Sequence, residues 1–477
     1  MSVRKTGLSI VSLLLLIGSL HAQTLDKEVF AERRQRLMDR MDGGVAVFQN
    51  TPVSNRNSDV DYPYRSDSDF YYLTGYKHAS AAFILAPAEE KAFILFVQPK
   101  NLMTSLWLGD IPGIEGAMEE FGADTAYAFD EFVDVLSRFV GTSQKLYYDI
   151  RNERLSETIR SALPSRERGG PEQMVDVLPV IHELRVIKGP EEIKLLEKTI
   201  GITCQALVEV MKAAEPGMYE YELGAIIDYV YKKNGSQRKG FPSIIGSGPR
   251  STIFHYEAND RQTRSGDVVL MDIGAEYGYY SADVTRTIPI DGRFSQEQRD
   301  IYEIVLAAQE AAIEVMVPGN GAREYYTHAE DVIKESLYRL GLITDRNTMW
   351  QHRAYYYPYI GHWLGLDPHD AGSYGDGPAG RPLEPGMVLT VEPGLYFGET
   401  MVEVFRQSML RRERIDEAEL DSFLQQVRPV FEKYMHIGVR IEDDILITSD
   451  GNRILSAGAP KTVKDIETTM KKKSRFN

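Results

Sequence analysis

Four acidic residues and one histidine lie in or beside apolar stretches that are typical of buried strands. They are Asp272, Asp283, His362, Glu392 and Glu442. A carboxylate is costly to bury in an apolar strand unless it is paired or bound to a metal. Gly278 lies in the segment between Asp272 and Asp283. We therefore expect these two carboxylates to face each other across an antiparallel strand pair.

Mutual repulsion decides what such a group of carboxylates needs. At a separation of about 4 Å and an effective dielectric of about 20, each like-charged pair repels by about 4 kcal/mol. Two hard divalent cations, held by four carboxylates and one imidazole, would remove that repulsion. The alternative is one ion pair per carboxylate, for instance with Arg286 or Arg440. Four acidic strand ends with a histidine nearby favour the two-metal site.

A two-metal site indicates hydrolysis of an amide or ester. Metals about 3.5–4 Å apart hold a water between them, bring its pKa towards about 7 and polarise a carbonyl group. His255 and His369 are candidates to donate hydrogen bonds to a developing oxyanion or to carry protons. The other histidines have no comparable surroundings and are expected to be structural.

The strands that carry these residues belong to a duplicated pattern. One helix pair ends at residues 216–217 and 234–235, and a second ends at 318–319 and 340–341. Each pair precedes an apolar strand, at 266–274 and at 386–394. In both strands an acidic residue stands six positions after one glycine and two before another. The pattern predicts two related halves with the site on a pseudo-twofold axis.

An additional domain precedes the duplication. A helical pattern at 26–41 and apolar runs at 44–48, 82–87, 92–97, 145–150 and 175–181 predict an α/β domain over residues 23–180. Gly189-Pro190 is a helix start, and the helix is expected to run to about Glu215. The fold class is therefore α/β (α+β), with a duplicated catalytic domain over residues 181–477.

Composition and the first residues bear on partners and compartment. The 477 residues carry a net charge of −16 and one cysteine, which disfavours nucleic acid and excludes cysteine-based zinc sites. Arg4 and Lys5 precede a short apolar run that ends in small residues at Ala22. This run is too short for a membrane anchor and predicts a signal peptide over residues 1–22, hence export to the periplasm or outside the cell.

With their flanking motifs, the five ligands resemble those of the dinuclear metallopeptidases of the pita-bread fold, and in particular the Xaa-Pro aminopeptidases (aminopeptidase P). The stretch from Arg56 to Gly75 is also similar to that family. The resemblance implies that Asp283 and Glu442 bridge two ions, usually manganese, with zinc and cobalt as alternatives. Asp272 would then bind one ion, and His362 and Glu392 the other.

The resemblance also assigns roles beyond the ligands. It implies that Glu392 is the general base and that His255 and His369 contact the substrate. Arg440 and Tyr396 match active-site positions. Trp107 is either a residue that lines the substrate site, of its own or of a neighbouring subunit, or a core residue. Homodimers or homotetramers are common in the family.

Two departures from the family pattern stand out. Pro358 occupies a position where the family usually has a histidine, and Tyr357 or Tyr359 is expected to fill the space. The segment 398–437 is longer than expected and contains an amphipathic helical pattern at 416–434, which is either a lid, a subunit contact or a surface helix.

Three functions follow in order of preference. The first is an exported Xaa-Pro aminopeptidase that acts on peptides with proline in second position. The second is an Xaa-Pro dipeptidase (prolidase). The third is a pita-bread binding module without catalysis, which the retention of all five ligands disfavours.

Overall fold

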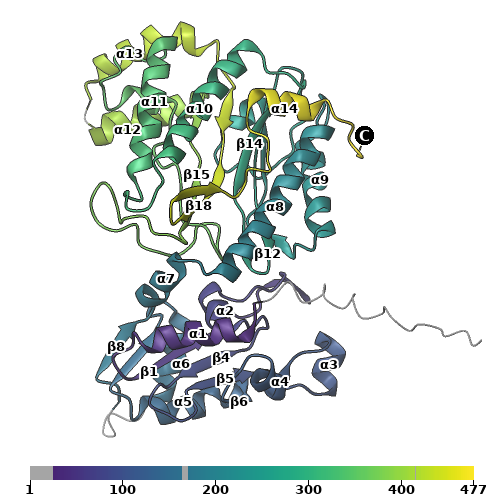
Figure 1. Cartoon of the computed structure of the whole chain (residues 1–477), viewed down its shortest axis with the longest axis vertical. Helices are drawn as coiled ribbons and strands as arrows, with labels where there is room; N and C mark the ends of the chain where they lie inside the picture. The colour runs from purple at the N-terminus through teal and green to yellow at the C-terminus, as the bar shows by residue number, and fades with distance from the viewer. Residues whose placement is uncertain (1–24, 164–169, 414, 477) are drawn as a thin grey trace, which may run out of the picture. The chain divides into compact units, whose positions relative to one another are not determined.

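The computed structural model describes residues 25–163, 170–413 and 415–476, which form two compact units. The first lies within residues 1–171, and the second consists mainly of residues 172–477 (Figure 1). The predicted signal peptide falls outside the described residues, and so it stays a prediction. Within the described ranges, every helix is too short or too polar to cross a bilayer.

The N-terminal part is built on a six-stranded mixed sheet in the order β6-β5-β4-β1-β7-β8. Its strands are β1 (Val45–Gln49), β4 (Ala82–Leu85), β5 (Phe93–Val97), β6 (Thr125–Ala128), β7 (Lys145–Tyr148) and β8 (Gln173–Asp176). A hairpin of β2 (Asn55–Asn57) and β3 (Val60–Asp61) is separate from it. The helices are α1 (Lys27–Met38), α2 (Ser68–Thr74), α3 (Leu102–Leu108), α4 (Gly113–Glu119), α5 (Phe132–Val140) and α6 (Glu153–Ala162).

One expected strand is wrong in part. The run 175–181 was expected to be extended, but β8 ends at Asp176 and α7 (Leu178–Val186) begins two residues later. Pro179 stands in the first turn of α7, where its missing N–H is not needed. A short apolar run is compatible with either a strand or a helix, and here the position of Pro179 is the sequence signal that favours a helix start.

The second unit shows the predicted duplication. Two helix pairs, α8 (Pro190–Ala213) with α9 (Glu220–Lys233) and α10 (Gln296–Glu314) with α11 (Glu324–Leu340), flank the central strands (Figure 1). Helix α11 ends at Gly341, whose left-handed backbone (φ 75°) closes the last turn. Helix α8 begins at Pro190, as predicted, and its last residue is Ala213.

Each helix pair is followed by a small antiparallel sheet. The first has the order β10-β11-β14 and the second β15-β18-β19. Their strands are β10 (Ile244–Ser247), β11 (Val268–Ile273), β14 (Val284–Pro289), β15 (Val388–Val391), β18 (Asp443–Thr448) and β19 (Gly451–Ile454). Shorter strands complete the unit: β9 (Arg238–Lys239), β12 (Ala275–Tyr277), β13 (Tyr280–Ser281), β16 (Gly394–Tyr396) and β17 (Gly438–Arg440). A final helix, α14 (Val463–Met470), follows them.

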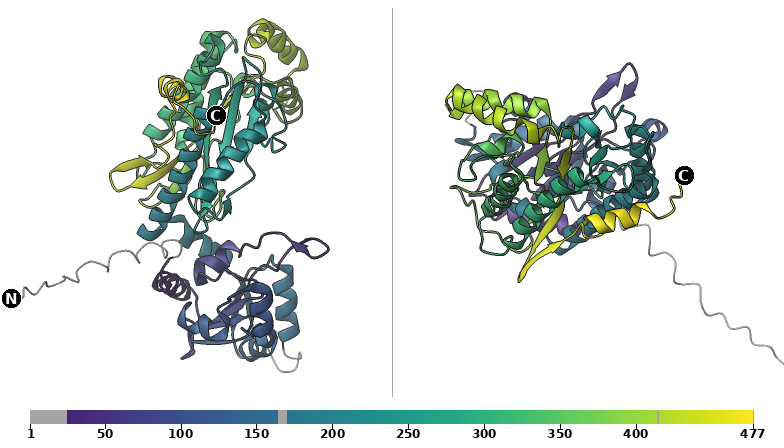
Figure 2. Two further views of the ribbon diagram at one scale, coloured as in Figure 1. Left: turned by 90° about the vertical axis from the view of Figure 1, so that its right-hand side faces the viewer. Right: turned by 90° about the horizontal axis from the view of Figure 1, so that it is seen from above.

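The long segment 398–437 folds into helices. Helices α12 (Glu399–Ser408) and α13 (Glu417–Phe431) lie side by side (Figures 1 and 2) and are joined by Arg406, which pairs with Glu417 and Asp421. The ring of Trp350 packs against both Phe405 of α12 and Phe423 of α13, which also contact each other. The amphipathic helix predicted at 416–434 is therefore present, with its apolar face buried.

Candidate active site and metal centre

One cavity of about 910 Å³ in the second unit receives all five predicted metal ligands. The predicted substrate and catalytic residues His255, His369, Tyr396 and Arg440 line the same cavity. Residues from strand ends that are far apart in the sequence thus share one chamber. This is the arrangement that the duplicated pattern predicts.

The first half contributes Asp272 and Asp283 through the pairing of β11 with β14. This pairing places Asp272 directly opposite Thr285. Asp283 precedes Thr285 by two residues in the same chain segment. Residues two apart on a strand share a face, so Asp272 and Asp283 are diagonal neighbours on one face. As expected, the two carboxylates lie on the same face of an antiparallel strand pair, but they are diagonal neighbours and not directly opposite each other.

The second half contributes Glu392 and Glu442 in a similar way. Strands β15 and β18 pair Val391 with Asp443, and the two glutamates stand just beyond this last pair. Glu442 is 1% exposed, and its Oε2 accepts a hydrogen bond of 2.7 Å from Thr285 Oγ1. Its own N–H donates to the Thr285 carbonyl at 3.1 Å, which joins the two halves at the site.

His362 is oriented to present one ring nitrogen to the carboxylates. Its Nδ1 lies 3.1 Å from the carbonyl oxygen of Trp363, which fits an Nδ1–H donor and leaves Nε2 free to bind a metal. Nε2 is 3.5 Å from Asp283 Oδ2 and 3.5 Å from Glu392 Oε1. Ligand atoms of Asp283, His362 and Glu442 all lie within 4.8 Å of one another.

Charge crowding marks this cluster as a cation site. Burial raises the pKa of Asp283 well above its usual range, and the neighbouring Glu442 raises it further. Burial likewise raises the pKa values of Glu442 and Glu392. Oδ1 of Asp272 is buried and has no hydrogen-bond partner among the described residues. A divalent cation would satisfy that oxygen and relieve the repulsion, so the donor set fits such an ion.

Arg440 holds Asp272 in place. Its Nη2 lies 2.5 Å from Asp272 Oδ2, its Nη1 donates to Tyr396 Oη at 2.9 Å, and its Nε lies 3.2 Å from Thr285 Oγ1. The guanidinium therefore occupies one oxygen of Asp272 and leaves the other for the cavity. Thr285, which bonds both Arg440 and Glu442, was not singled out from the sequence, although it lies between Asp283 and Arg286 in the motif.

The two predicted catalytic histidines lie at the ligand cluster. The ring of His369 stacks on His362 with centroids 3.8 Å apart and an interplanar angle of 10°. Burial, together with the neighbouring His362 and His255, lowers the pKa of His369 to about 4. His369 is therefore neutral near pH 7 and can donate one hydrogen bond. His255 lines the cavity with an exposed side chain.

Aromatic side chains form much of the remaining wall. Tyr357 and Tyr359, on either side of Pro358, both line the cavity. That one of them fills the space of the family's histidine stays a prediction. Phe254 packs 5.5 Å from Tyr357 and 4.6 Å from Tyr396 between ring centroids. Sequence reasoning missed further lining residues, namely Arg323, Tyr326 and Tyr374. They come from α11 and loops without a motif, so the sequence carries no signal for them.

Trp107 lies in the first unit, on α3. Its side chain is 77% exposed, and its indole nitrogen lies 3.1 Å from Met103 Sδ. A core role is therefore excluded within this chain. Its assignment to a substrate site stays a prediction.

Comparison with known proteins agrees with this site. Residues 194–449 match the model of metallopeptidase family M24, and residues 30–147 match the N-terminal domain of aminopeptidase P. The chain belongs to metallopeptidase family M24. It is therefore a peptide-bond hydrolase of a metal-dependent family, and the resemblance seen in the sequence is confirmed.

Full-length relatives share both parts of the chain. Xaa-Pro aminopeptidase of Haemophilus influenzae is 37% identical over 453 residues, which cover 94% of this chain and 98% of that protein. The solved structure of Pseudomonas aeruginosa aminopeptidase PepP has a TM-score of 0.84 at 34% identity, with 94% and 98% of the two chains covered. A glutamate-to-alanine variant of Escherichia coli aminopeptidase P in complex with substrate has a TM-score of 0.83 at the same identity and coverage.

Proposed function

We propose that this protein is an exported Xaa-Pro aminopeptidase with two divalent metal ions. It would hydrolyse the bond between an N-terminal residue and a following proline. The observation that carries the proposal is the meeting of Asp272, Asp283, His362, Glu392 and Glu442 in one cavity. The names of the full-length relatives support the choice of substrate.

The chain's own residues divide the work. Bound divalent ions, for which manganese is the proposed metal, would supply an activated water and polarise the substrate carbonyl. Asp283 and Glu442 would hold both ions, Asp272 one of them, and His362 the other together with Glu392. Glu392 would accept the proton of the water as general base, since its carboxylate lies at the cavity wall. Neutral His369 would donate a hydrogen bond to the carbonyl oxygen as negative charge develops on it.

Substrate choice would follow from charge and shape. A peptide bond to proline has no N–H and carries a rigid ring, so it needs a pocket built for it. The rings of Phe254, Tyr357 and Tyr396 provide an apolar surface against which a pyrrolidine ring can pack. The carboxylates would favour the free amino group of the first residue.

A peptide panel tests the proposal. Purified protein with Mn²⁺ should cleave Xaa-Pro-Yaa peptides and leave the matched Xaa-Ala-Yaa peptides largely intact, and Glu392→Gln should be inactive while it still folds. Equal cleavage of both series would refute proline specificity. Cleavage of Gly-Pro but not of Gly-Pro-Yaa would identify a dipeptidase instead.

Export and assembly are parts of the same proposal. The leader pattern over residues 1–22 supports export, and N-terminal sequencing of the protein from the periplasm or medium should begin at Gln23. A mature protein that retains Met1 would contradict it. We also propose a homodimer or homotetramer, because α3 exposes Leu102, Met103, Leu106 and Trp107. Light scattering should report a multiple of the chain mass, and a monomer would contradict this part.

A further inference from the structure

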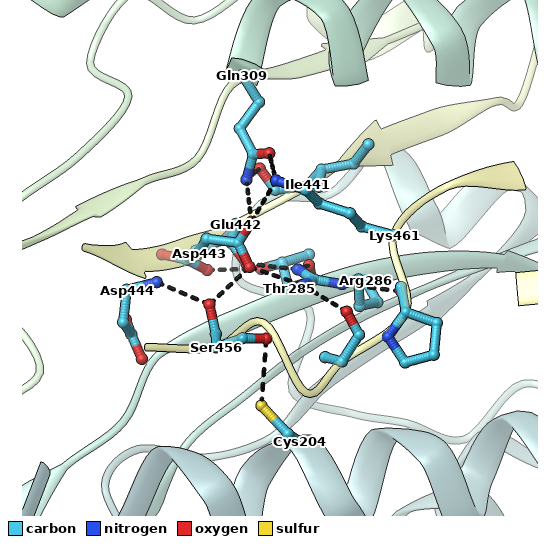
Figure 3. Close-up of polar contacts among 12 residues, drawn as sticks. Cys204, Thr285, Arg286, Gln309, Ile441, Glu442, Asp443, Asp444, Ser456 and Lys461 are labelled. Atoms are coloured by element: carbon cyan, nitrogen blue, oxygen red, sulfur yellow. Dashed lines mark hydrogen bonds and ion pairs between the residues drawn. The ribbon is translucent and has the colours of Figure 1, made fainter. Parts of the chain in front are cut away.

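A group of charged and polar side chains lies buried behind the ligand strands, away from the cavity. It consists of Arg286, Gln309, Asp443, Ser456 and Lys461, and we call it the anchor network (Figure 3). Arg286, Gln309, Asp443 and Ser456 are all fully buried. Neither the metal ligands nor the catalytic histidines account for these residues.

Asp443 is the centre of the anchor network. Its Oδ1 accepts hydrogen bonds from Arg286 Nη2 at 2.7 Å and from Ser456 Oγ at 2.6 Å. Its Oδ2 accepts from Lys461 Nζ at 2.9 Å and from Gln309 Nε2 at 3.0 Å. Hydrogen bonds from four different residues thus hold both oxygens of this carboxylate (Figure 3).

Arg286 donates hydrogen bonds from all three of its side-chain nitrogens. Nε donates to the Pro460 carbonyl at 3.1 Å, and Nη2 donates to the Ala459 carbonyl at 3.0 Å as well as to Asp443. Nη1 donates to the Thr285 carbonyl at 2.9 Å and to the Glu442 carbonyl at 2.6 Å. The guanidinium thus joins the segment after β19 to the backbone of a predicted bridging ligand.

The contacts of the network fall on backbone groups beside the ligands. Arg286 holds the carbonyl of Glu442 itself. Gln309 Nε2 lies 3.4 Å from the carbonyl of Ile441 and 3.5 Å from that of Val391, the residues that precede Glu442 and Glu392. Side chains alternate along an extended chain, so Asp443 points away from the cavity while Glu442 points into it.

We propose that Asp443 and Arg286 are positioning residues, which with Gln309, Ser456 and Lys461 set the placement of the carboxylates of Glu442 and Glu392 for metal binding. The proposal rests on the proposed metal-dependent function. A buried ion pair gives little stability that a well-packed apolar core would not also give. The anchor network also contacts the backbone beside Glu442 and Glu392, so it can position these two proposed ligands, which apolar packing could not do.

The test compares variants of the anchor network with a matched control. Ser456→Ala removes one donor to Asp443, Lys461→Met removes another while it keeps most of the stem, and Asp443→Asn removes the charge. The control is Asp267→Asn, which breaks the largely buried pair with Arg261 at the opposite end of β11. For each EDTA-treated protein, the thermal midpoint, the Mn²⁺ dissociation constant by calorimetry and the visible spectrum of added Co²⁺ are measured.

The expected result separates positioning from stability. Removing a partner that orients a ligand typically weakens metal binding by about 10- to 100-fold. We expect that range for Ser456→Ala and Lys461→Met, with an altered Co²⁺ spectrum, and partial recovery in Lys461→Arg. The control should lower the thermal midpoint while it leaves both metal readouts unchanged.

Two outcomes would overturn the proposal. If the variants lose thermal stability but keep the wild-type Mn²⁺ constant and Co²⁺ spectrum, the network is only structural. If Asp443→Asn does not fold, Ser456→Ala and Lys461→Met decide the question. If the wild-type protein itself binds neither Mn²⁺ nor Co²⁺, the proposed function fails and the positioning role fails with it.

Discussion

Replacing Asp283 by Asn should make the metal-free protein more stable while it removes the response to metal. Asp283 and Glu442 bring ligand atoms within 4.8 Å of each other in a buried site. Such a cluster can bind a cation, and without the cation its carboxylates repel one another. The substitution keeps the size of the side chain and removes one of the negative charges.

The expected gain follows from the geometry. Two like charges no more than 4.8 Å apart at an effective dielectric of about 20 repel by about 3.5 kcal/mol or more. The gain in stability stays below the full repulsion, because burial and the neighbouring Glu442 raise the pKa of Asp283, so that proton uptake relieves part of the repulsion. The gain should therefore be largest at alkaline pH, where the cluster must ionise.

The pH dependence has a definite sign. Because the pKa values of Asp283 and Glu442 are raised on folding, the native metal-free state binds more protons than the unfolded state above the ordinary carboxyl range, near pH 4. The free energy of unfolding then falls as the pH rises through that window. Asp283→Asn should flatten this decline.

Denaturant unfolding of EDTA-treated protein between pH 5 and 9, with and without Mn²⁺, measures both effects. Wild-type protein should gain stability from Mn²⁺, and Asp283→Asn should gain much less. Asp267→Asn, which lies outside the cluster, should keep the wild-type slope with pH. The reasoning is refuted if metal-free Asp283→Asn is less stable than wild type at pH 9, or if its slope is unchanged.

Three further predictions concern the cavity and its surroundings. Burial favours a raised pKa for Asp370, but Arg185 and Lys188 outweigh it and hold the pKa at about 2, a difference from 3.8 that corresponds to about 2 kcal/mol. This stability is present above pH 4 and is lost as the pH falls towards 2. Asp370→Asn should therefore be less stable than wild type at pH 5 and should approach the wild-type stability near pH 2. A difference in unfolding free energy that does not narrow in acid would contradict this. His369→Gln should lower kcat by about 100-fold or more while Mn²⁺ binding is retained, and an unchanged kcat would exclude a catalytic role. Tyr357→Ala should reduce the ratio of kcat/KM for Xaa-Pro-Yaa over Xaa-Ala-Yaa by about 3- to 10-fold if its ring packs against proline, and an unchanged ratio would exclude that contact.

The sequence predicted the parts of the fold that local patterns determine. Helix α8 begins at a proline and α11 is followed by a glycine. Asp272 lies next to the last residue of β11, and Glu392 directly follows β15. The residues that meet in the cavity could therefore be identified from the sequence, and their role as metal ligands stays a prediction. The strand expected at 175–181 failed because its apolar run fits two kinds of element.

The remaining parts of the site depend on contacts that no local pattern records. Gln309 lies in the middle of an amphipathic helix, and only the packing of α10 against β15 and β17 brings it to Asp443. Thr285 is a strand residue whose hydroxyl serves both Glu442 and Arg440 because two sheets meet there. Residue type and spacing give no indication of either partnership.

The division of the ligands between the two halves has a consequence for synthesis of the protein. A nascent chain that has been made only as far as Tyr396 already carries Asp272, Asp283, His362 and Glu392, but it lacks Glu442 and the strand that pairs with β15. If the proposed ligand Glu442 is required for metal binding, peptide hydrolysis would begin only after the second half of the chain has been made.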